Sequence, residues 1–173
     1  IGGALILGLP TPLNALQILW VNFFTDSFPA VALAFENGEN HLQEKPVNFK
    51  KGLLNSPMRF LIIVVGGFTS ALLLGSYFYF LKIGLPEGTA KALLFSMYGT
   101  YSLFSLFSVR SLTRSIFSHN PFKNKYVLIS FCLGIFLIGA ALYFPALQAL
   151  LGLSSLPLHL LLIMLAFGFA NIL

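Results

Sequence analysis

The chain has 173 residues, of which 57% are hydrophobic and only 9% are charged, and its mean hydropathy is +0.88. A soluble domain usually carries about 25% charged residues, so this composition excludes a soluble domain and predicts a protein that crosses the membrane several times. The net charge of +5 is therefore interpreted through membrane topology, and the expected partner is the lipid bilayer and not nucleic acid.

Apolar segments of membrane-spanning length follow one another along the chain. About 20 helical residues are needed to cross about 30 Å of hydrocarbon. One partial span and five full spans are predicted, at residues 1–10, 16–35, 60–81, 91–109, 126–143 and 156–173. We therefore expect an all-α fold, a polytopic membrane helix bundle that forms one domain over 1–173. Because the first span is cut short at Ile1, we expect the sequence to be a fragment of a longer protein.

The basic residues are unequally distributed between the connecting segments. Eight of the ten lie in the segments 36–59 and 110–125, whereas 82–91 holds two and the loop at 144–155 holds none. Short basic loops stay on the cytoplasmic side. The first full span is therefore predicted to enter the membrane from outside, and the C-terminus is predicted to be cytoplasmic.

A single carboxylate, Asp26, lies in the middle of the first full span, within the stretch WVNFFTDSFPAVAL. A charge at that depth costs about 2.5–3.5 kcal/mol on insertion scales, so Asp26 must face the bundle interior, water or a cation. On an α-helix Asn22, Thr25 and Asp26 share one face, and their oxygens suit Ca²⁺, Mg²⁺, Mn²⁺, Na⁺ or K⁺. The alternative is a structural aspartate that is hydrogen-bonded to a neighbouring helix.

Pro29 lies one helical turn after Thr25. Proline has no N–H group and clashes with the carbonyl four residues earlier, which here belongs to Thr25. We predict that the helix breaks, by a kink or by unwinding, around Thr25 and Asp26, where freed carbonyl groups would add to cation binding. A routine proline kink is the alternative.

The segment LPTPLNALQILWVNFFTDSFPAVALAFE at 9–36 resembles the sixth transmembrane helix of P-type cation-transporting ATPases, above all that of the calcium-pump branch. The segments EKPVNFKKGLLN and SVRSLTRSIFSHNPFKNKYVLIS are similar to the family's connections between helices six and seven and, in bacterial members, between helices eight and nine. The resemblance implies that residues 1–173 are the C-terminal membrane transport domain, from the end of helix five to helix ten, of an ATP-driven pump in a bacterial cell membrane.

The resemblance also implies roles for individual residues. The family's helix-six cation ligands fall on Asn22, Thr25 and Asp26, and they favour Ca²⁺ or Mn²⁺ as the transported ion. The remaining ligands, together with the domains that bind ATP and Mg²⁺ and become phosphorylated, are expected in other parts of the same pump. No catalytic residue is predicted in this sequence, and the enzyme activity, ATP hydrolysis coupled to cation transport, would belong to the parent protein.

One position departs from the family pattern. Calcium pumps that carry two ions place a glutamate on helix eight, where this sequence has Ser102. The whole span 91–109 contains no carboxylate. We favour a packing serine over a weak, neutral ligand, and this favours a single-ion site of the secretory-pathway type.

Two other classes of function compete with the pump. A stand-alone channel or secondary cation transporter could use Asp26 in its pathway, and a membrane scaffold would transport no ion. Secondary transporters usually show repeated halves that each contain a broken helix, whereas only the first full span carries such a motif here. A scaffold would have no use for three oxygen ligands on one helix face. The pump interpretation requires a DKTGT phosphorylation motif upstream of Ile1.

Overall fold

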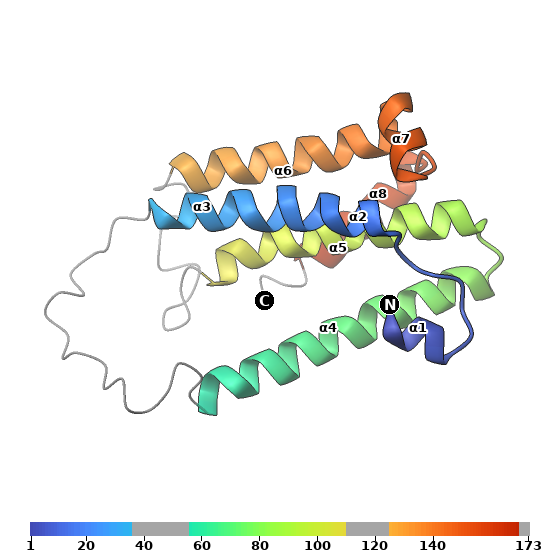
Figure 1. Cartoon of the computed structure of the whole chain (residues 1–173), viewed down its shortest axis with the longest axis horizontal. Coiled ribbons are helices and arrows are strands. Elements are labelled where there is room, and N and C mark those ends of the chain that lie inside the picture. The colour runs from blue at the N-terminus through green and yellow to red at the C-terminus, as the bar shows by residue number, and fades with distance from the viewer. Residues whose placement is uncertain (36–55, 110–124, 170–173) are drawn as a thin grey trace, which may run out of the picture.

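The computed structural model describes residues 1–35, 56–109 and 125–169, and every regular element in these ranges is a helix (Figure 1). The elements are α1 (Gly2–Ile6), α2 (Ala15–Val21), the π-helix η1 (Asn22–Ser27), α3 (Phe28–Ala34), α4 (Ser56–Lys82), α5 (Glu87–Val109), α6 (Lys125–Tyr143), α7 (Pro145–Leu151) and α8 (Leu158–Phe169). The predicted all-α membrane helix bundle is confirmed.

Three stretches of the described residues are long and apolar enough to cross a bilayer, namely Ala15–Ala34, Ile62–Lys82 and Lys125–Tyr143. The helix α5 has 23 residues, which is about 34 Å at about 1.5 Å per residue. Its serines, threonines and tyrosines make it less apolar than these three stretches. The helix α8 has 12 described residues, and the predicted end of the last span at 170–173 lies outside the described residues. The count of five full spans stays a prediction.

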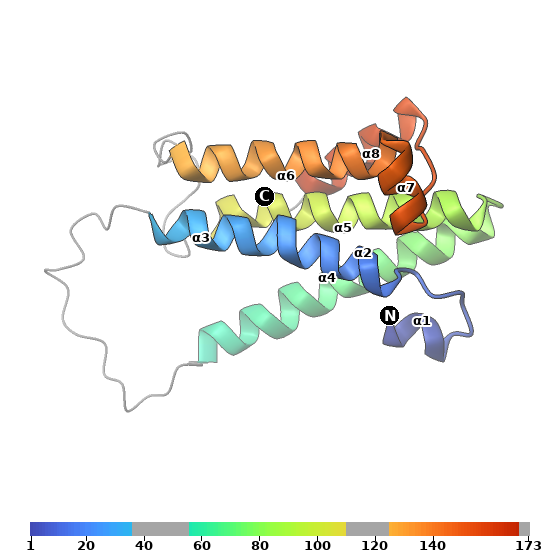
Figure 2. The same cartoon turned by 45° about the horizontal axis from the view of Figure 1, so that its top comes forward.

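The helix α5 is the centre of the bundle. It packs against α8, α4, α6, η1 and α2, and it contributes the buried side chains of Leu93, Phe95, Met97 and Leu103. The continuous span α2–η1–α3 runs alongside α5 and α6, whereas α4 diverges from them towards its N-terminal end (Figures 1 and 2). Because neighbouring helices surround α5, its polar side chains need not face lipid, and this explains how a less apolar helix is tolerated.

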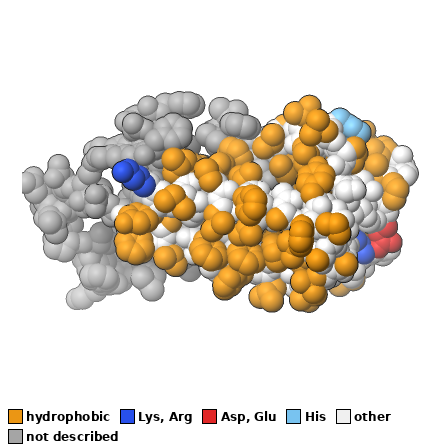
Figure 3. Space-filling view, turned by 90° about the horizontal axis from the view of Figure 1, so that it is seen from above, with side chains coloured by type: hydrophobic (Ala, Val, Ile, Leu, Met, Phe, Trp, Pro, Cys, Tyr) orange, Lys and Arg blue, Asp and Glu red, His pale blue; other side chains and the backbone are white. Residues whose placement is uncertain are grey.

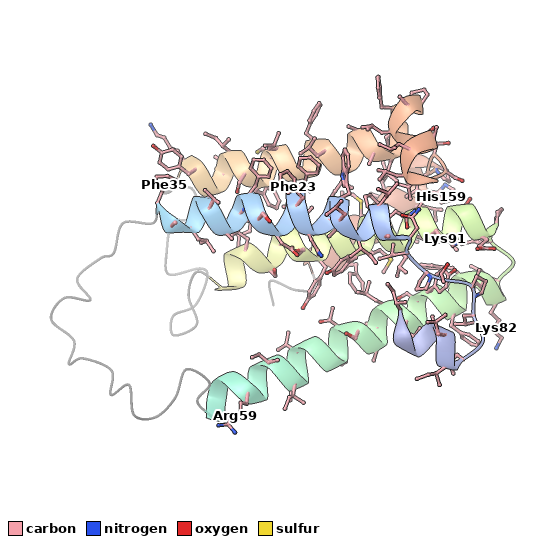
Figure 4. All side chains as sticks on the ribbon, viewed as in Figure 1. Phe23, Phe35, Arg59, Lys82, Lys91 and His159 are labelled. Atoms are coloured by element: carbon pink, nitrogen blue, oxygen red, sulfur yellow. The ribbon has the colours of Figure 1, made fainter. Side chains whose placement is uncertain are left out.

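The surface of the bundle separates into an apolar band and two charged ends. Hydrophobic side chains cover most of the described surface seen in Figure 3. Lys82, Lys91 and His159 lie at one end of the molecule, and Arg59 lies at the other (Figure 4). Lys91 forms a salt bridge of 2.5 Å with Glu87, one turn away on α5. This distribution is typical of a membrane protein, in which charged ends lie in water and the apolar band between them contacts lipid.

Most of the basic segments used to predict the topology lie outside the described residues, but the helices that they join are described. The ends of α3 and α5 and the starts of α4 and α6 all lie at the Arg59 end of the bundle (Figure 1). The four helix ends that border residues 36–55 and 110–124 therefore lie on one side of the bundle, as the count of basic residues requires. That this side is cytoplasmic stays a prediction.

A short helix, α7, occupies the segment 144–155, which was expected to be a loop. Two residues explain its boundaries. Pro145 is its first residue, a position that proline favours. Gly152, with φ of 64°, ends it in the left-handed conformation that glycine adopts easily. The interpretation of this segment as a plain loop was wrong. The helix closes the end of the bundle where α6 meets α8, and it provides the partner for the start of α2.

The start of α2 is fixed to the end of α7 by two amide side chains. Asn14 and Gln17 form a reciprocal capping box, with N–O distances of 2.8 and 2.9 Å. Both side chains also donate to the carbonyl oxygen of Leu151, at 2.8 Å from Asn14 Nδ2 and 2.9 Å from Gln17 Nε2. A carbonyl oxygen has two lone pairs and can accept both bonds. Gln17 is fully buried, so this end of the first span is held in place.

Replacing Gln17 with leucine is expected to lower the midpoint temperature of thermal unfolding of the purified protein in detergent. The substitution keeps the side-chain volume but leaves the backbone N–H of Asn14 without its partner and removes one bond to Leu151, a loss of about 1–3 kcal/mol. Asn14→Ser keeps an oxygen that can cap the helix and removes the amide that donates to Leu151, so its effect should be smaller. A Gln17→Leu protein as stable as the original would contradict this account.

Candidate intramembrane cation site

The first membrane span changes its helical form at the predicted site. Between α2 and α3 the residues Asn22–Ser27 form a π-helix, in which hydrogen bonds span five residues instead of four. Pro29 is the second residue of α3 and has no N–H to continue the regular pattern. The sequence predicted a kink or unwinding around Thr25 and Asp26, whereas the structure has a π turn there, and a break caused by Pro29 stays a prediction. Such turns are frequent at functional sites.

Two carbonyl groups at the start of the π-helix accept hydrogen bonds from its own side chains. One of them is bonded by a side chain, because Ser27 Oγ donates to the carbonyl oxygen of Asn22 at 3.0 Å. The hydroxyl of Thr25 similarly donates to the carbonyl oxygen of Val21 at 2.7 Å. Hydroxyl groups that bond to nearby backbone carbonyls often bend helices. Both bonds end at the start of the π-helix, on Val21 and Asn22, so its own side chains bond to its N-terminal end.

The carboxylate of Asp26 meets a side chain from the central helix. Ser102 Oγ on α5 donates a hydrogen bond to Asp26 Oδ1. The hydroxyl of Ser105, one turn further on, donates to the carbonyl oxygen of Ser102 at 2.6 Å. The sequence favoured Ser102 as a packing residue, whereas the structure gives its hydroxyl a charged partner. A role for Ser102 as a cation ligand stays a prediction.

The three residues proposed from spacing do not lie in one environment. Asn22 and Asp26 are exposed on the surface of the described chain. Thr25 is only 1% exposed and its methyl group lies beside Gly99 of α5, 3.7 Å from where a Cβ at that glycine would stand. A π turn takes more residues than an α turn, so residues three apart no longer align as they do in an α-helix. Asn22 and Asp26 are both exposed, whereas Thr25 turns towards α5, and a common site for the three residues stays a prediction.

The site in this chain contains a single carboxylate. Within the described ranges, no group of three or more His, Cys, Asp and Glu side chains is close enough to hold a metal ion. The hydrogen-bond partner that the structure gives Asp26 is the neutral hydroxyl of Ser102. Hard cations such as Ca²⁺ take six to eight oxygen ligands. The oxygens described around Asp26 alone could supply only part of the ligands that such a cation needs.

The comparison with known proteins decides the family. The family model of the cation transporting ATPase C-terminus matches residues 10–173. The chain belongs to this family. It is 33% identical to calcium-transporting ATPase 1 of Bacillus cereus over 90% of its own length and 32% identical to the calcium-transporting ATPase of Bacillus subtilis over 91%. It is also 32% identical over 90% of its length to calcium-transporting ATPase type 2C member 2 of Rattus norvegicus.

Membership of the cation-transporting ATPases confirms the resemblance stated from the sequence. The chain spans about a fifth of the length of the relatives it matches, 19% for both Bacillus proteins and 17% for the rat protein. It corresponds to their C-terminal membrane domain, and with its apolar spans it is a multi-pass integral membrane protein. The exposed Asn22 and Asp26 lie within the matched residues.

Sequence reasoning missed two of the polar contacts around the site. The link between Asn14, Gln17 and α7 had a local signal, because Asn followed three residues later by Gln is a capping-box pattern. The hydrogen bond between Thr69 of α4 and Tyr101 of α5 had none, because it depends on how two helices are rotated against each other.

Proposed function

We propose that this chain is the membrane domain of an ATP-driven pump for Ca²⁺ or Mn²⁺, and that Asn22, Thr25 and Asp26 provide part of its intramembrane cation site. ATP and Mg²⁺ would bind to cytoplasmic domains of the same pump, outside this sequence. The C-terminus would be cytoplasmic, and the host membrane would be a bacterial cell membrane.

The observation that carries the proposal is the position of Asp26. It is a carboxylate in the middle of a membrane span, on a π turn, with a neutral hydroxyl from Ser102 as its partner. The salt bridge of the described residues, Glu87 with Lys91, lies at one end of the bundle. A carboxylate at that depth without a cationic side chain as its partner is stabilised by a bound cation. Carboxylate, amide and hydroxyl oxygens favour hard cations, and the relatives are named calcium-transporting.

A transport assay with four cations tests the proposal. The intact protein would be purified and placed in lipid vesicles, and ATP-dependent uptake of Ca²⁺, Mn²⁺, Na⁺ and K⁺ would be compared. We expect uptake of Ca²⁺ or Mn²⁺ and none of the monovalent ions. Uptake of Na⁺ or K⁺ alone would contradict the assigned ion class, and uptake that needs no ATP would favour the channel or secondary transporter.

We further propose that Ser102 positions the carboxylate and does not add a second ion site. Its bond to Oδ1 leaves Oδ2 and the remaining lone pairs of Asp26 free for a cation, while it restricts the rotation of the side chain. Losing one such bond costs about 1 kcal/mol. We therefore expect Ser102→Ala to raise the dissociation constant for Ca²⁺ about three- to tenfold.

The same variant distinguishes a positioning residue from a ligand of a second ion. Equilibrium binding of radioactive Ca²⁺ to the purified intact protein should give one ion per molecule before and after the substitution. A decrease from two ions to one in Ser102→Ala would show that Ser102 belongs to a second site and would contradict the single-ion proposal.

A further inference from the structure

Thr69 is a buried polar residue in a stretch of α4 whose other residues are exposed or half-buried. It is the only buried residue between 62 and 76, with 9% of its surface exposed, whereas the adjacent Phe68 is 65% exposed. A buried hydroxyl group costs free energy unless it is hydrogen-bonded. A polar residue at the one buried position of this stretch therefore indicates a specific polar contact with the rest of the bundle.

The contact is with Tyr101 of α5. Thr69 Oγ1 lies 2.7 Å from the carbonyl oxygen of Val65 and 2.7 Å from the hydroxyl oxygen of Tyr101. A hydroxyl group has one proton to donate, so when Thr69 donates to Val65 the hydroxyl of Tyr101 donates to Thr69. The ring of Tyr101 also packs against Phe167 of α8, with ring centres 6.0 Å apart. This side chain therefore joins α4, α5 and α8.

Tyr101 directly precedes Ser102, the partner of Asp26. Successive residues of an α-helix point about 100° apart, so α5 offers one hydroxyl to α4 and the next one to η1. A rotation of α5 about its axis would break both bonds together. The bond between Thr69 and Tyr101 opposes that rotation directly beside the residue that contacts the carboxylate.

We propose that Thr69 and Tyr101 are a positioning pair for the cation site. They hold α5 in the rotation that directs Ser102 Oγ at Asp26, and they touch no cation themselves. This inference rests on the proposed function, because it assigns the pair a role in cation binding at Asp26. It predicts that the effect of the pair on cation affinity passes through Ser102.

The test measures binding of radioactive Ca²⁺ to the purified intact protein by equilibrium dialysis. Thr69→Val and Tyr101→Phe remove one hydroxyl each and keep the shape of the side chain. Each should raise the dissociation constant for Ca²⁺ about two- to fivefold, with no change in the number of ions bound. Thr69→Ser restores the hydroxyl and should restore the affinity. The matched control is Ser70→Ala, which removes an exposed hydroxyl from the next position of α4.

Combined variants show whether the pair acts through Ser102. Tyr101→Phe together with Thr69→Val should bind Ca²⁺ no more weakly than either single variant. In a protein that already carries Ser102→Ala, Tyr101→Phe should have no further effect on the dissociation constant. Independent, additive effects would overturn the inference, and so would a lower unfolding temperature in Thr69→Val with an unchanged affinity for Ca²⁺.

The variant Asp26→Asn separates this inference from the proposed function. If that variant loses Ca²⁺ binding while Thr69→Val and Tyr101→Phe retain full affinity, only the positioning pair is disproved. If Asp26→Asn itself binds Ca²⁺ normally, the proposed function fails.

Discussion

Substitution of Asp26 by asparagine is expected to abolish cation-dependent phosphorylation of the intact protein by ATP, while the protein still inserts into the membrane. Asparagine has nearly the same shape as aspartate, and Ser102 can donate to its amide oxygen as it does to the carboxylate. The substitution therefore removes the charge and preserves the packing around η1.

The size of the effect follows from electrostatics. Two unit charges 4 Å apart interact by about 4 kcal/mol at the effective dielectric constant of a protein, which corresponds to roughly a thousandfold change in binding. With the one mid-span carboxylate of the described residues removed, cation binding should fall by at least about 100-fold. The measurement is the steady-state level of phosphorylated protein as a function of Ca²⁺ concentration.

A second carboxylate provides the matched control for Asp26→Asn. Glu87→Gln makes the same change of charge at the end of α5, where Glu87 is paired with Lys91. It should leave the Ca²⁺ dependence of phosphorylation unchanged. Unchanged Ca²⁺ dependence in Asp26→Asn would defeat the claim that Asp26 binds the cation.

Substitution of Gly168 by valine is expected to separate α8 from α5 and to destabilise the domain strongly. A Cβ atom at Gly168 would lie 2.6 Å from Thr100 Cγ2 and 2.7 Å from Phe104 Cδ2. The ring of Phe104 is buried and packs edge-on against Phe131, with ring centres 5.2 Å apart, so it has little freedom to move. Overpacking of this kind costs about 1–3 kcal/mol or more.

The control for Gly168→Val is the same substitution in α6. Gly139→Val introduces an identical side chain where no atom lies within 4 Å of the new Cβ. Both variants carry the same change in intrinsic helix preference, so the difference between their unfolding temperatures in detergent measures the clash alone. Equal unfolding temperatures would show that α8 and α5 can move apart at no cost.

The spans were predictable because they depend on composition over long windows. Segments of about 20 apolar residues can satisfy their backbone groups in lipid only as helices, and α4 and α6 begin and end within a few residues of their predicted limits. The helix α7 was missed because it has seven residues, too few for a composition signal. Its signals were Pro145 and Gly152 alone, which also occur in loops.

The candidate site could be proposed from the sequence, but the directions of its side chains could not. The charge of Asp26 and the ring of Pro29 are chemical properties of the sequence, so the irregular helix could be placed around Asp26. The burial of Thr25 could not be predicted, because it depends on the π-helical geometry of η1. The spacing of a regular α-helix placed Thr25 on the same face as Asp26. The bond between Asp26 and Ser102 required the relative rotation of two helices, which a single sequence does not contain.

The π turn also changes the direction in which the buried residues of the first span point. The buried residues Gln17, Val21, Thr25 and Pro29 recur at every fourth position. In a regular α-helix, a step of four residues overshoots a full turn by about 40°, so a stripe with this spacing would wind around the helix by about 120° over three steps. The wider turn of η1 absorbs part of this drift. A stripe that would otherwise spiral towards lipid thus winds less along the bundle, and Asp26, one position after Thr25, lies at the edge of that stripe.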